Sequence, residues 1–298
     1  MSISHYQPLL AQHYLYCQSL ARQRVSLAAW HAVAAESIGY RHVQQALPCQ
    51  DKAAAHAGER PRLVLCDGAG SAVCSEQGSQ ALVQGMQRLL VSIEPMLAQY
   101  LDDEVPTEAE QRQLALIFMR HAKGINGDLA RNQRRSGNDF RSTLLLAVAG
   151  KRRLFWLQIG DGVLAVRHNS EMGAEWSLLN VPNKGEYANQ TDFVDPQLNE
   201  SQARYGVYPT GWVSGVVAMS DGAAERLFSA QHHRFAPLLE TWCSEHSRAE
   251  LIHEHLSHVE LWKKTSGDDK SVALLVSEPK VTKAPFNVQK LFGSYLGW

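Results

Sequence analysis

The stretch Leu63-Val64-Leu65-Cys66-Asp67-Gly68-Ala69-Gly70-Ser71 decides the fold, because in it an apolar run ends abruptly in an aspartate and two glycines. Consecutive apolar residues between Arg62 and Asp67 are typical of a strand that is covered on both faces. Gly68 and Gly70 allow the backbone to approach whatever the carboxylate binds. The stretch therefore predicts a buried strand that delivers a carboxylate to a tight turn.

The same arrangement recurs along the chain. Two further apolar runs end in Ile159-Gly160-Asp161-Gly162 and in Met219-Ser220-Asp221-Gly222. An acidic pair, Asp268-Asp269, comes just before the apolar run Ser271 to Val276. Four acidic sites at strand ends indicate convergence on a cation. Clustered carboxylates without a matching set of histidines and cysteines favour hard, oxygen-preferring cations, above all magnesium or manganese.

Composition narrows the class of protein. A chain of 298 residues with 45% apolar content can bury a large core. The 29 basic and 30 acidic residues leave a net charge of −1, which argues against a nucleic-acid or membrane partner. No stretch approaches the about 18 apolar residues of a membrane span. The five cysteines are odd in number and Cys66 lies in a core strand, so a reducing compartment, the cytoplasm, is expected.

The chain has no internal repeat and no clear linker, which favours one globular domain. We expect three parts: an N-terminal helix or arm over residues 1–24, the domain over residues 25–278 and a C-terminal tail over residues 279–298. A strand is predicted over Val25 to Ile38, and a polar loop over Gly39 to Gln50.

Local signals predict further elements. Ser75 is the expected N-cap of one helix, and Thr107-Glu108-Ala109-Glu110 fits a capping box at the start of another. From Ser142 the pattern changes to short apolar runs, which predict an antiparallel meander. These runs cover residues 143–148, 153–159 and 163–167. The polar segment Asn183 to Asn199 is long for a connection and predicts a binding flap.

In their order and number, these motifs resemble the metal-dependent protein phosphatases of the phosphatase 2C family, in particular its bacterial stand-alone members. The resemblance runs from about Gly39 to Val276. It implies an α+β fold, a four-layer α-β-β-α sandwich of two packed antiparallel sheets flanked by helices. It also implies hydrolysis of phosphoserine and phosphothreonine in proteins by a metal-bridging water, without a covalent enzyme intermediate. Two to three Mn²⁺ or Mg²⁺ ions are the implied cofactors.

The resemblance assigns roles to individual residues. The implied metal ligands are Asp67, Gly68, Asp161, Asp221 and Asp268. The implied catalytic residues are Asp51, Asp67, Asp221 and Asp268. Among these, Asp67 would bridge two ions, Asp161 would serve a third, looser ion, and Asp51 would orient metal-bound water. Glu225 and Asp269 stand beside these motifs without an assigned role.

Three departures from the family pattern affect the expected chemistry. Gln50 replaces the acidic residue that usually precedes Asp51, so the second ion is expected to bind more weakly or through water. Ala69 replaces a histidine that some members carry, which removes an obvious general acid. No arginine stands at a clear offset before Asp51, so Arg41 and His42 are the nearest candidates for phosphate contact.

The predicted partners are phosphorylated proteins and, by the resemblance alone, a cognate serine/threonine kinase that acts as antagonist. Within the flap, Lys184, Glu186 and Tyr187 are expected to contact the protein substrate.

The alternative function is a catalytically weak phosphoprotein-binding regulator on the same fold, motivated by Gln50 and Ala69. The acidic residues retained at the other motifs argue against it. Gly68-Ala69-Gly70 also imitates the start of a dinucleotide fingerprint, and Ala218 to Gly222 imitates a nucleophile elbow, but each lacks a required glycine. The substrate, the physiological metal and the oligomeric state stay open.

Overall fold

The computed structural model describes residues 30–103, 105–170, 173–180, 191–244 and 247–277. The predicted N-terminal arm and C-terminal tail lie outside these residues. So do the three flap residues Lys184, Glu186 and Tyr187. The domain boundaries therefore remain predictions.

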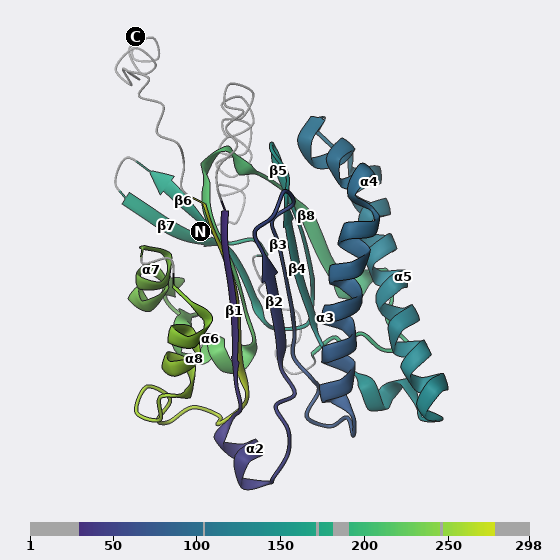
Figure 1. Cartoon of the computed structure of the whole chain (residues 1–298), viewed down its shortest axis with the longest axis vertical. Helices are drawn as coiled ribbons and strands as arrows, with labels where there is room; N and C mark the ends of the chain where they lie inside the picture. The colour runs from purple at the N-terminus through teal and green to yellow at the C-terminus, as the bar shows by residue number, and fades with distance from the viewer. Residues whose placement is uncertain (1–29, 104, 171–172, 181–190, 245–246, 278–298) are drawn as a thin grey trace, which may run out of the picture.

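Two antiparallel five-stranded sheets form the centre of the molecule (Figure 1). The first sheet has the strand order β2 (Lys52–His56), β3 (Arg62–Cys66), β4 (Leu144–Ala149), β5 (Arg153–Ile159) and β8 (Ala203–Pro209). The second has the order β1 (Trp30–Ser37), β12 (Lys270–Ser277), β9 (Val213–Met219), β6 (Val163–Ser170) and β7 (Gly173–Leu178). A separate two-stranded ladder joins β10 (Phe228–Ser229) to β11 (Arg234–Phe235).

Helices cover the outer faces of both sheets (Figure 1). The first sheet is covered by α3 (Ser75–Ser92), α4 (Glu94–Ala98) and α5 (Glu108–Gln133). The second is covered by α6 (Asp221–Leu227), α7 (Pro237–Ser244) and α8 (Ala249–Ser257), while α2 (Tyr40–Gln44) follows β1. Shorter helical turns are η2 (Gln99–Asp103), η3 (Gly137–Phe140), η4 (Glu200–Gln202) and η5 (Thr210–Trp212). The predicted four-layer sandwich is confirmed.

Strand β3 shows why the opening stretch of sequence is apolar without interruption. Its successive side chains point to opposite faces of the sheet. Leu63 and Leu65 join the core between the two sheets, whereas Val64 and Cys66 join the core beneath α3 and α5. All four side chains are fully buried. A third core, which includes Trp242, lies between the second sheet and its helices.

The predicted meander is partly wrong. Strands β4 and β5 pair antiparallel as expected, but β6 lies in the other sheet, between β7 and β9. The turn after β5 leads the chain from the first sheet to the second. Gly160 adopts φ +105° there, and a Cβ on Gly162 would lie 2.7 Å from the Met219 carbonyl oxygen. Because the apolar runs of all three strands are largely buried, their patterns do not reveal which sheet each strand joins.

The helix starts give one confirmation and one correction. At α5 the capping box is present, since the Glu110 N–H donates to Thr107 Oγ1 at 3.3 Å and the Thr107 N–H donates to Glu110 Oε2 at 2.7 Å. At α3 the N-cap is Cys74, and Ser75 is the first helical residue. The Ser75 side chain packs against the turn that follows β3, since a Cβ on Gly68 would lie 2.8 Å from Ser75 Cβ.

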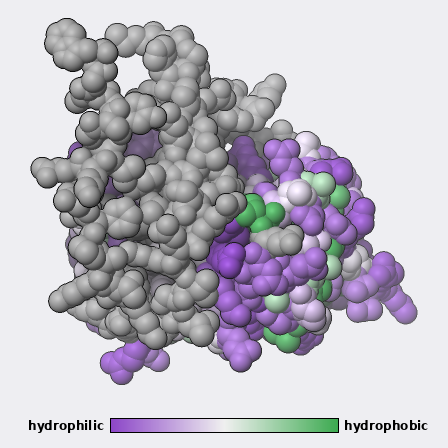
Figure 2. Space-filling model, turned by 90° about the horizontal axis from the view of Figure 1, so that it is seen from above, coloured by the Kyte–Doolittle hydropathy of each residue, from purple (hydrophilic) through white to green (hydrophobic). Residues whose placement is uncertain are grey.

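The predicted loop from Gly39 to Gln50 contains the short helix α2. In the residues that the structure describes, no helix has the length and apolar content needed to cross a membrane. Seen from above, the described surface is mostly hydrophilic, and its hydrophobic residues form small separate patches (Figure 2).

Candidate metal centre

The predicted acidic residues lie at strand ends that the two sheets bring together. Asp51 directly precedes β2 and Asp67 directly follows β3. These strands pair antiparallel, so the two aspartates lie at the same edge. In the other sheet, Asp221 follows β9 closely and Asp268 precedes β12, and these strands also pair antiparallel. The charges of Asp51, Asp221 and Asp268 all raise the pKa of Asp67, which places the four carboxylates in one electrostatic cluster.

Asp67 is held by its backbone. Its N–H donates to Thr143 Oγ1 at 2.9 Å, and its carbonyl oxygen accepts from the Thr143 N–H at 2.8 Å. Burial raises the pKa of the Asp67 carboxyl well above its ordinary value, and the neighbouring carboxylates raise it further. A cation brought to the cluster would oppose both effects and favour the ionised carboxylate.

Asp51 is the most enclosed member of the cluster, with 1% of its surface exposed. Neither carboxylate oxygen has a hydrogen-bond partner of ordinary geometry in the described residues. Burial raises the pKa of Asp51 to about 7, although the nearby hydroxyls of Ser220 and Ser271 oppose that rise. Two buried oxygens without donors are suited to a cation or to water molecules around one.

Asp221 opens helix α6, where its Oδ1 accepts from the Gly222 N–H at 2.5 Å. Burial raises the pKa of Asp221, and the charges of Asp161 and Asp268 raise it further. Gly222 is required by the close approach of the last acidic loop, because a Cβ there would lie 2.1 Å from the Asp269 carbonyl oxygen.

Asp161 lies at the margin of the cluster. Its side chain is exposed in the turn between β5 and β6, and its Oδ2 accepts from Thr191 Oγ1 at 2.5 Å. Because its charge acts on Asp221, it is close enough to share the site's electrostatics.

Asp269 braces the loops instead of joining the open carboxylates. Its two oxygens accept from the backbone N–H groups of Gly39 and Gln50, each at 2.6 Å. His42 Nδ1 lies 2.8 Å from Asp269 Oδ2. His42 is 8% exposed, so this placement argues against its predicted contact with substrate. The Gln50 side chain is also buried, and its Oε1 has no described donor.

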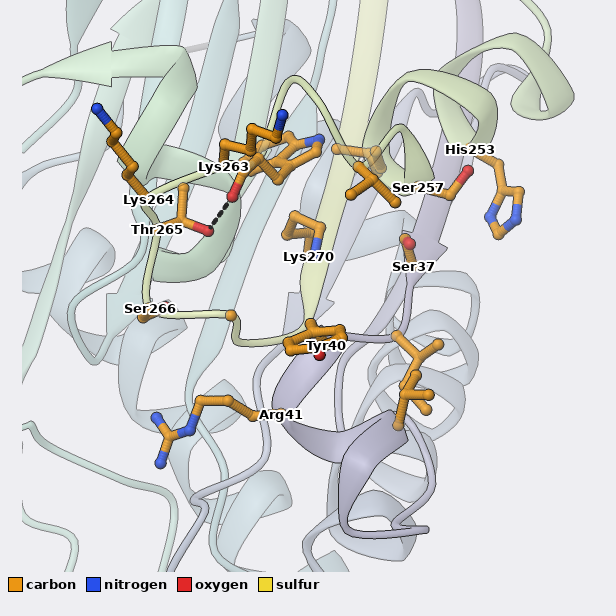
Figure 3. A pocket seen from close by; sticks show the side chains of 16 residues that line it. Ser37, Tyr40, Arg41, His253, Ser257, Lys263, Lys264, Thr265, Ser266 and Lys270 are labelled. Carbon is orange, nitrogen blue, oxygen red and sulfur yellow. Dashed lines mark hydrogen bonds between the residues drawn. The ribbon is translucent and has the colours of Figure 1, made fainter.

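Glu225 and Arg41 lie beside the cluster. A Glu225 carboxylate oxygen accepts from the Ser266 N–H at 2.9 Å, which fixes the loop before Asp268. The Arg41 N–H donates to the Gly267 carbonyl oxygen at 2.9 Å, and its exposed side chain extends away from the groove drawn in Figure 3.

Several supporting residues were missed at the sequence level. Ser220 and Ser271 tie β9 to β12, since the Ser271 N–H donates to Ser220 Oγ at 3.0 Å and the Ser220 N–H donates to the Ser271 carbonyl at 3.1 Å. A Cβ on Gly39 would lie 2.3 Å from the Asp268 carbonyl carbon. Both serines are adjacent to predicted motifs, which is the signal that could have found them.

In the described part of the chain, no three histidine, cysteine, aspartate or glutamate side chains already form a group that could hold a metal ion. The donor set nevertheless fits a divalent cation. It consists of oxygens alone, and neither oxygen of its most buried member, Asp51, has a donor of ordinary geometry among the described residues, where the Ser220 and Ser271 hydroxyls lie nearby. Oxygen donors of this kind are typical of magnesium and manganese sites.

Comparisons with known proteins agree with this class of site. The family model of protein phosphatase 2C matches residues 38–259. Serine/threonine-protein phosphatase 3 of Escherichia coli (strain K12) is 26% identical over 213 residues, which cover 65% of this chain and 74% of the relative.

Solved structures share the fold. Serine-threonine phosphatase 2C from Toxoplasma gondii has a TM-score of 0.55 at 14% identity, covering 85% of this chain and 96% of its own. The catalytic domain of the serine threonine protein phosphatase PstP, in complex with two manganese ions, has a TM-score of 0.54 at 15% identity, covering 83% and 98%.

The fold and the oxygen-rich centre define a metal-dependent phosphatase of the α-β-β-α type. The chain belongs to the protein phosphatase 2C family. It is a protein serine/threonine phosphatase.

Proposed function

We propose that the carboxylate cluster binds two divalent cations, manganese or magnesium, and that this centre dephosphorylates phosphoserine and phosphothreonine. Asp67, Asp221 and Asp268 would hold the two ions together with the Gly68 carbonyl, and Asp161 would serve a third. The observation that carries the proposal is the buried Asp51 carboxylate, whose oxygens lack described donors while its pKa is raised to about 7.

Divalent cations at this centre would supply an activated water nucleophile and would neutralise phosphate charge. The chain's own residues fix the geometry around them. Thr143 holds the backbone of Asp67, and Asp269 holds the segment that leads into Asp51. The two Asp51 oxygens are available to accept hydrogen bonds from water and so to orient it. Ala69, which stands where some family members carry a histidine, is 4% exposed and has no acidic group to offer.

The substrates would be phosphorylated proteins, with a serine/threonine kinase as the opposing enzyme. The cytoplasm is the proposed compartment, which the unpaired described cysteines support. The alternative of a phosphoprotein-binding regulator is not favoured, because the acidic set is retained and the family match extends over most of the domain.

Turnover tests the proposal. Chelated protein should hydrolyse neither an aryl phosphate nor a phosphothreonine peptide, and added Mn²⁺ or Mg²⁺ should restore both activities. Undiminished turnover after exhaustive chelation would contradict the metal centre. Metal binding without turnover of any phosphopeptide would favour the regulator.

A further inference from the structure

A groove lies next to the carboxylate cluster, on the side of the second sheet's helices (Figure 3). Its volume is about 650 Å³, and its walls come from the end of β1, from α2, from α8 and from the loop before β12. Apolar side chains contribute much of the lining. Among them Tyr40, Val43 and Val259 are more than half exposed, and all three line this one groove.

The charged residues of this groove are all basic. Its lining includes Arg41, Lys263, Lys264 and Lys270 and contains no aspartate or glutamate. Lys263 pairs with Glu260 at 2.5 Å, but both side chains are more than 60% exposed, so this pair is weak. In the described residues, Lys264 pairs with no carboxylate. The Arg41 side chain extends away from the groove, and Lys270 is 6% exposed with its ammonium over the Trp262 ring, so Lys263 and Lys264 are the cations that a ligand can reach. We call this surface, apolar inside and cationic in charge, the basic groove.

The basic groove adjoins the candidate metal centre. Two side chains of α6 hold the loop that forms one wall of the groove. Arg226 donates to the Lys263 carbonyl oxygen, and Glu225 accepts from the Ser266 N–H. Helix α6 begins at Asp221, and Gly267 of the groove directly precedes Asp268. A ligand in the groove would therefore lie next to the segment that presents two of the candidate metal ligands.

The positive charge of the basic groove indicates which kind of segment can bind in it. Residues 1–29 contain no aspartate or glutamate. Residues 278–298 contain three lysines and only Glu278 as an acidic side chain. Neither terminal segment matches a cationic groove, whereas an acidic segment of another protein does. Apolar side chains on that segment would cover the exposed lining, while its carboxylates would face Lys263 and Lys264.

We infer that the basic groove docks an acidic segment of the phosphoprotein substrate that also carries apolar side chains, separate from the phosphoresidue at the metal centre. This inference rests on the proposed function, because it names the docked protein as a substrate, but the docking itself requires no turnover. It makes acidic phosphoproteins the favoured substrate class, because docking adds binding energy that a small phosphate ester cannot obtain.

Direct binding tests the groove independently of catalysis. The probe is a fluorescein-labelled, unphosphorylated peptide of about 12 residues in which glutamates alternate with leucine and phenylalanine, titrated in EDTA at about 0.15 M salt. Replacing both lysines (K263E/K264E) should raise its Kd at least about tenfold. The control R88E/R120E makes the same charge change on the exposed faces of α3 and α5 and should leave Kd within about twofold.

Equal weakening by both double variants would overturn the docking assignment, because the effect would then be one of net charge. Stronger binding to phosphatidylserine vesicles than to the peptide would overturn it in favour of a lipid surface. Should K263E/K264E fail to fold, V259D provides the same test, since Val259 is 76% exposed and the new carboxylate would repel the probe.

Catalysis then tests the link to the substrate. With Mn²⁺, K263E/K264E should lower kcat/KM for a phosphoprotein with an acidic segment by about tenfold relative to its kcat/KM for an aryl phosphate. An unchanged ratio would contradict a role in substrate docking. Failure of the proposed function would appear differently, as absence of Mn²⁺-dependent turnover in the wild type while the peptide still binds in EDTA.

Discussion

Two groups of acidic residues in this molecule have opposite electrostatics. In the first, the Arg60 guanidinium lies between Glu94 at 2.6 Å and Asp102 at 2.8 Å. Burial alone would raise the pKa of Asp102, but the hydrogen bonds from Arg60 and from the Lys151 N–H, together with the charges of these two residues, outweigh burial and lower it. In the second group, burial and neighbouring carboxylates raise the pKa values of Asp51 and Asp67.

From this difference we infer that Asp102 and Glu94 have a structural role, whereas the acids of the carboxylate cluster are proposed to bind a ligand. Arg60 is 7% exposed and brings to its carboxylates the positive charge that a buried anion requires. Among the described residues, no arginine pairs with a carboxylate of the cluster, although the Lys270 ammonium interacts with Asp51 and Asp268 through its charge. Neither Asp51 oxygen has a donor of ordinary geometry there. We therefore propose that the cluster receives its positive charge from a cation that comes from solution.

The largest effect is expected from a substitution at the centre of the carboxylate cluster. Asp67→Asn should lower kcat/KM on both aryl phosphate and phosphopeptide by about 10³-fold or more, equivalent to about 4 kcal/mol, because the shared ligand of two ions is lost. The matched control is Asp102→Asn, which changes an acid of the other group and should keep kcat/KM within about threefold. Comparable losses in the two variants would erase the distinction between the groups.

A second substitution removes the Arg60 guanidinium from between Glu94 and Asp102. Arg60→Met should lower the free energy of unfolding by about 3 kcal/mol, because it leaves Asp102 and Glu94 without their cation. Urea unfolding at neutral pH measures the change. The loss should shrink as pH falls through the lowered folded-state pKa of Asp102, because protonation removes the charge that Arg60 balances. A loss that does not change with pH would indicate packing instead.

The cluster should show the reverse pH dependence. The folded chain keeps a proton on Asp51 up to about pH 7, whereas the unfolded chain releases it near 3.8. The unfolded state thus binds fewer protons in that interval, so the stability of chelated protein should fall as pH rises from about 4 to about 7. We expect a loss of about 1 to 3 kcal/mol, which Asp51→Asn should remove and Mn²⁺ should reverse. A wild-type stability that rises over this interval, with no difference from Asp51→Asn, would contradict the assigned burial cost.

The smallest expected effect concerns the margin of the cluster. Asp161→Ala should reduce kcat by about tenfold, or about 1.4 kcal/mol, while leaving the tighter ions bound, because Asp161 is exposed and held only through Thr191. Calorimetry with Mn²⁺ measures the number of tight ions. If the Asp161 variant lost those ions while the Asp67 variant kept them, the proposed roles would be exchanged.

Local features of the fold could be predicted from sequence. The strand β3 with its aspartate turn, and the capping box of α5, depend on residues that are close together in the chain. The apolar residues of β6 are buried on both faces, Leu164 and Val166 between the sheets and Ala165 beneath the helices, so the sequence pattern could not show that this strand crosses to the second sheet.

At the site, the acidic residues could be predicted from their motifs, but the role of Asp269 could not. Its carboxylate binds the backbone of Gly39 and Gln50, which are 230 and 219 positions away in the chain. Contacts of that range leave no periodic or local signal. The family resemblance gave the order of the motifs, whereas only the structure shows that Asp269 braces loops while Asp51 keeps two oxygens without donors.

The most direct test of the central claim is calorimetric titration of chelator-treated protein with Mn²⁺, for wild type, Asp67→Asn and Asp102→Asn. The proposed centre predicts at least two ions on wild type and on Asp102→Asn, and at least about tenfold weaker binding with fewer ions on Asp67→Asn. Equal stoichiometry and affinity in all three proteins would show that the carboxylate cluster is not the cation site.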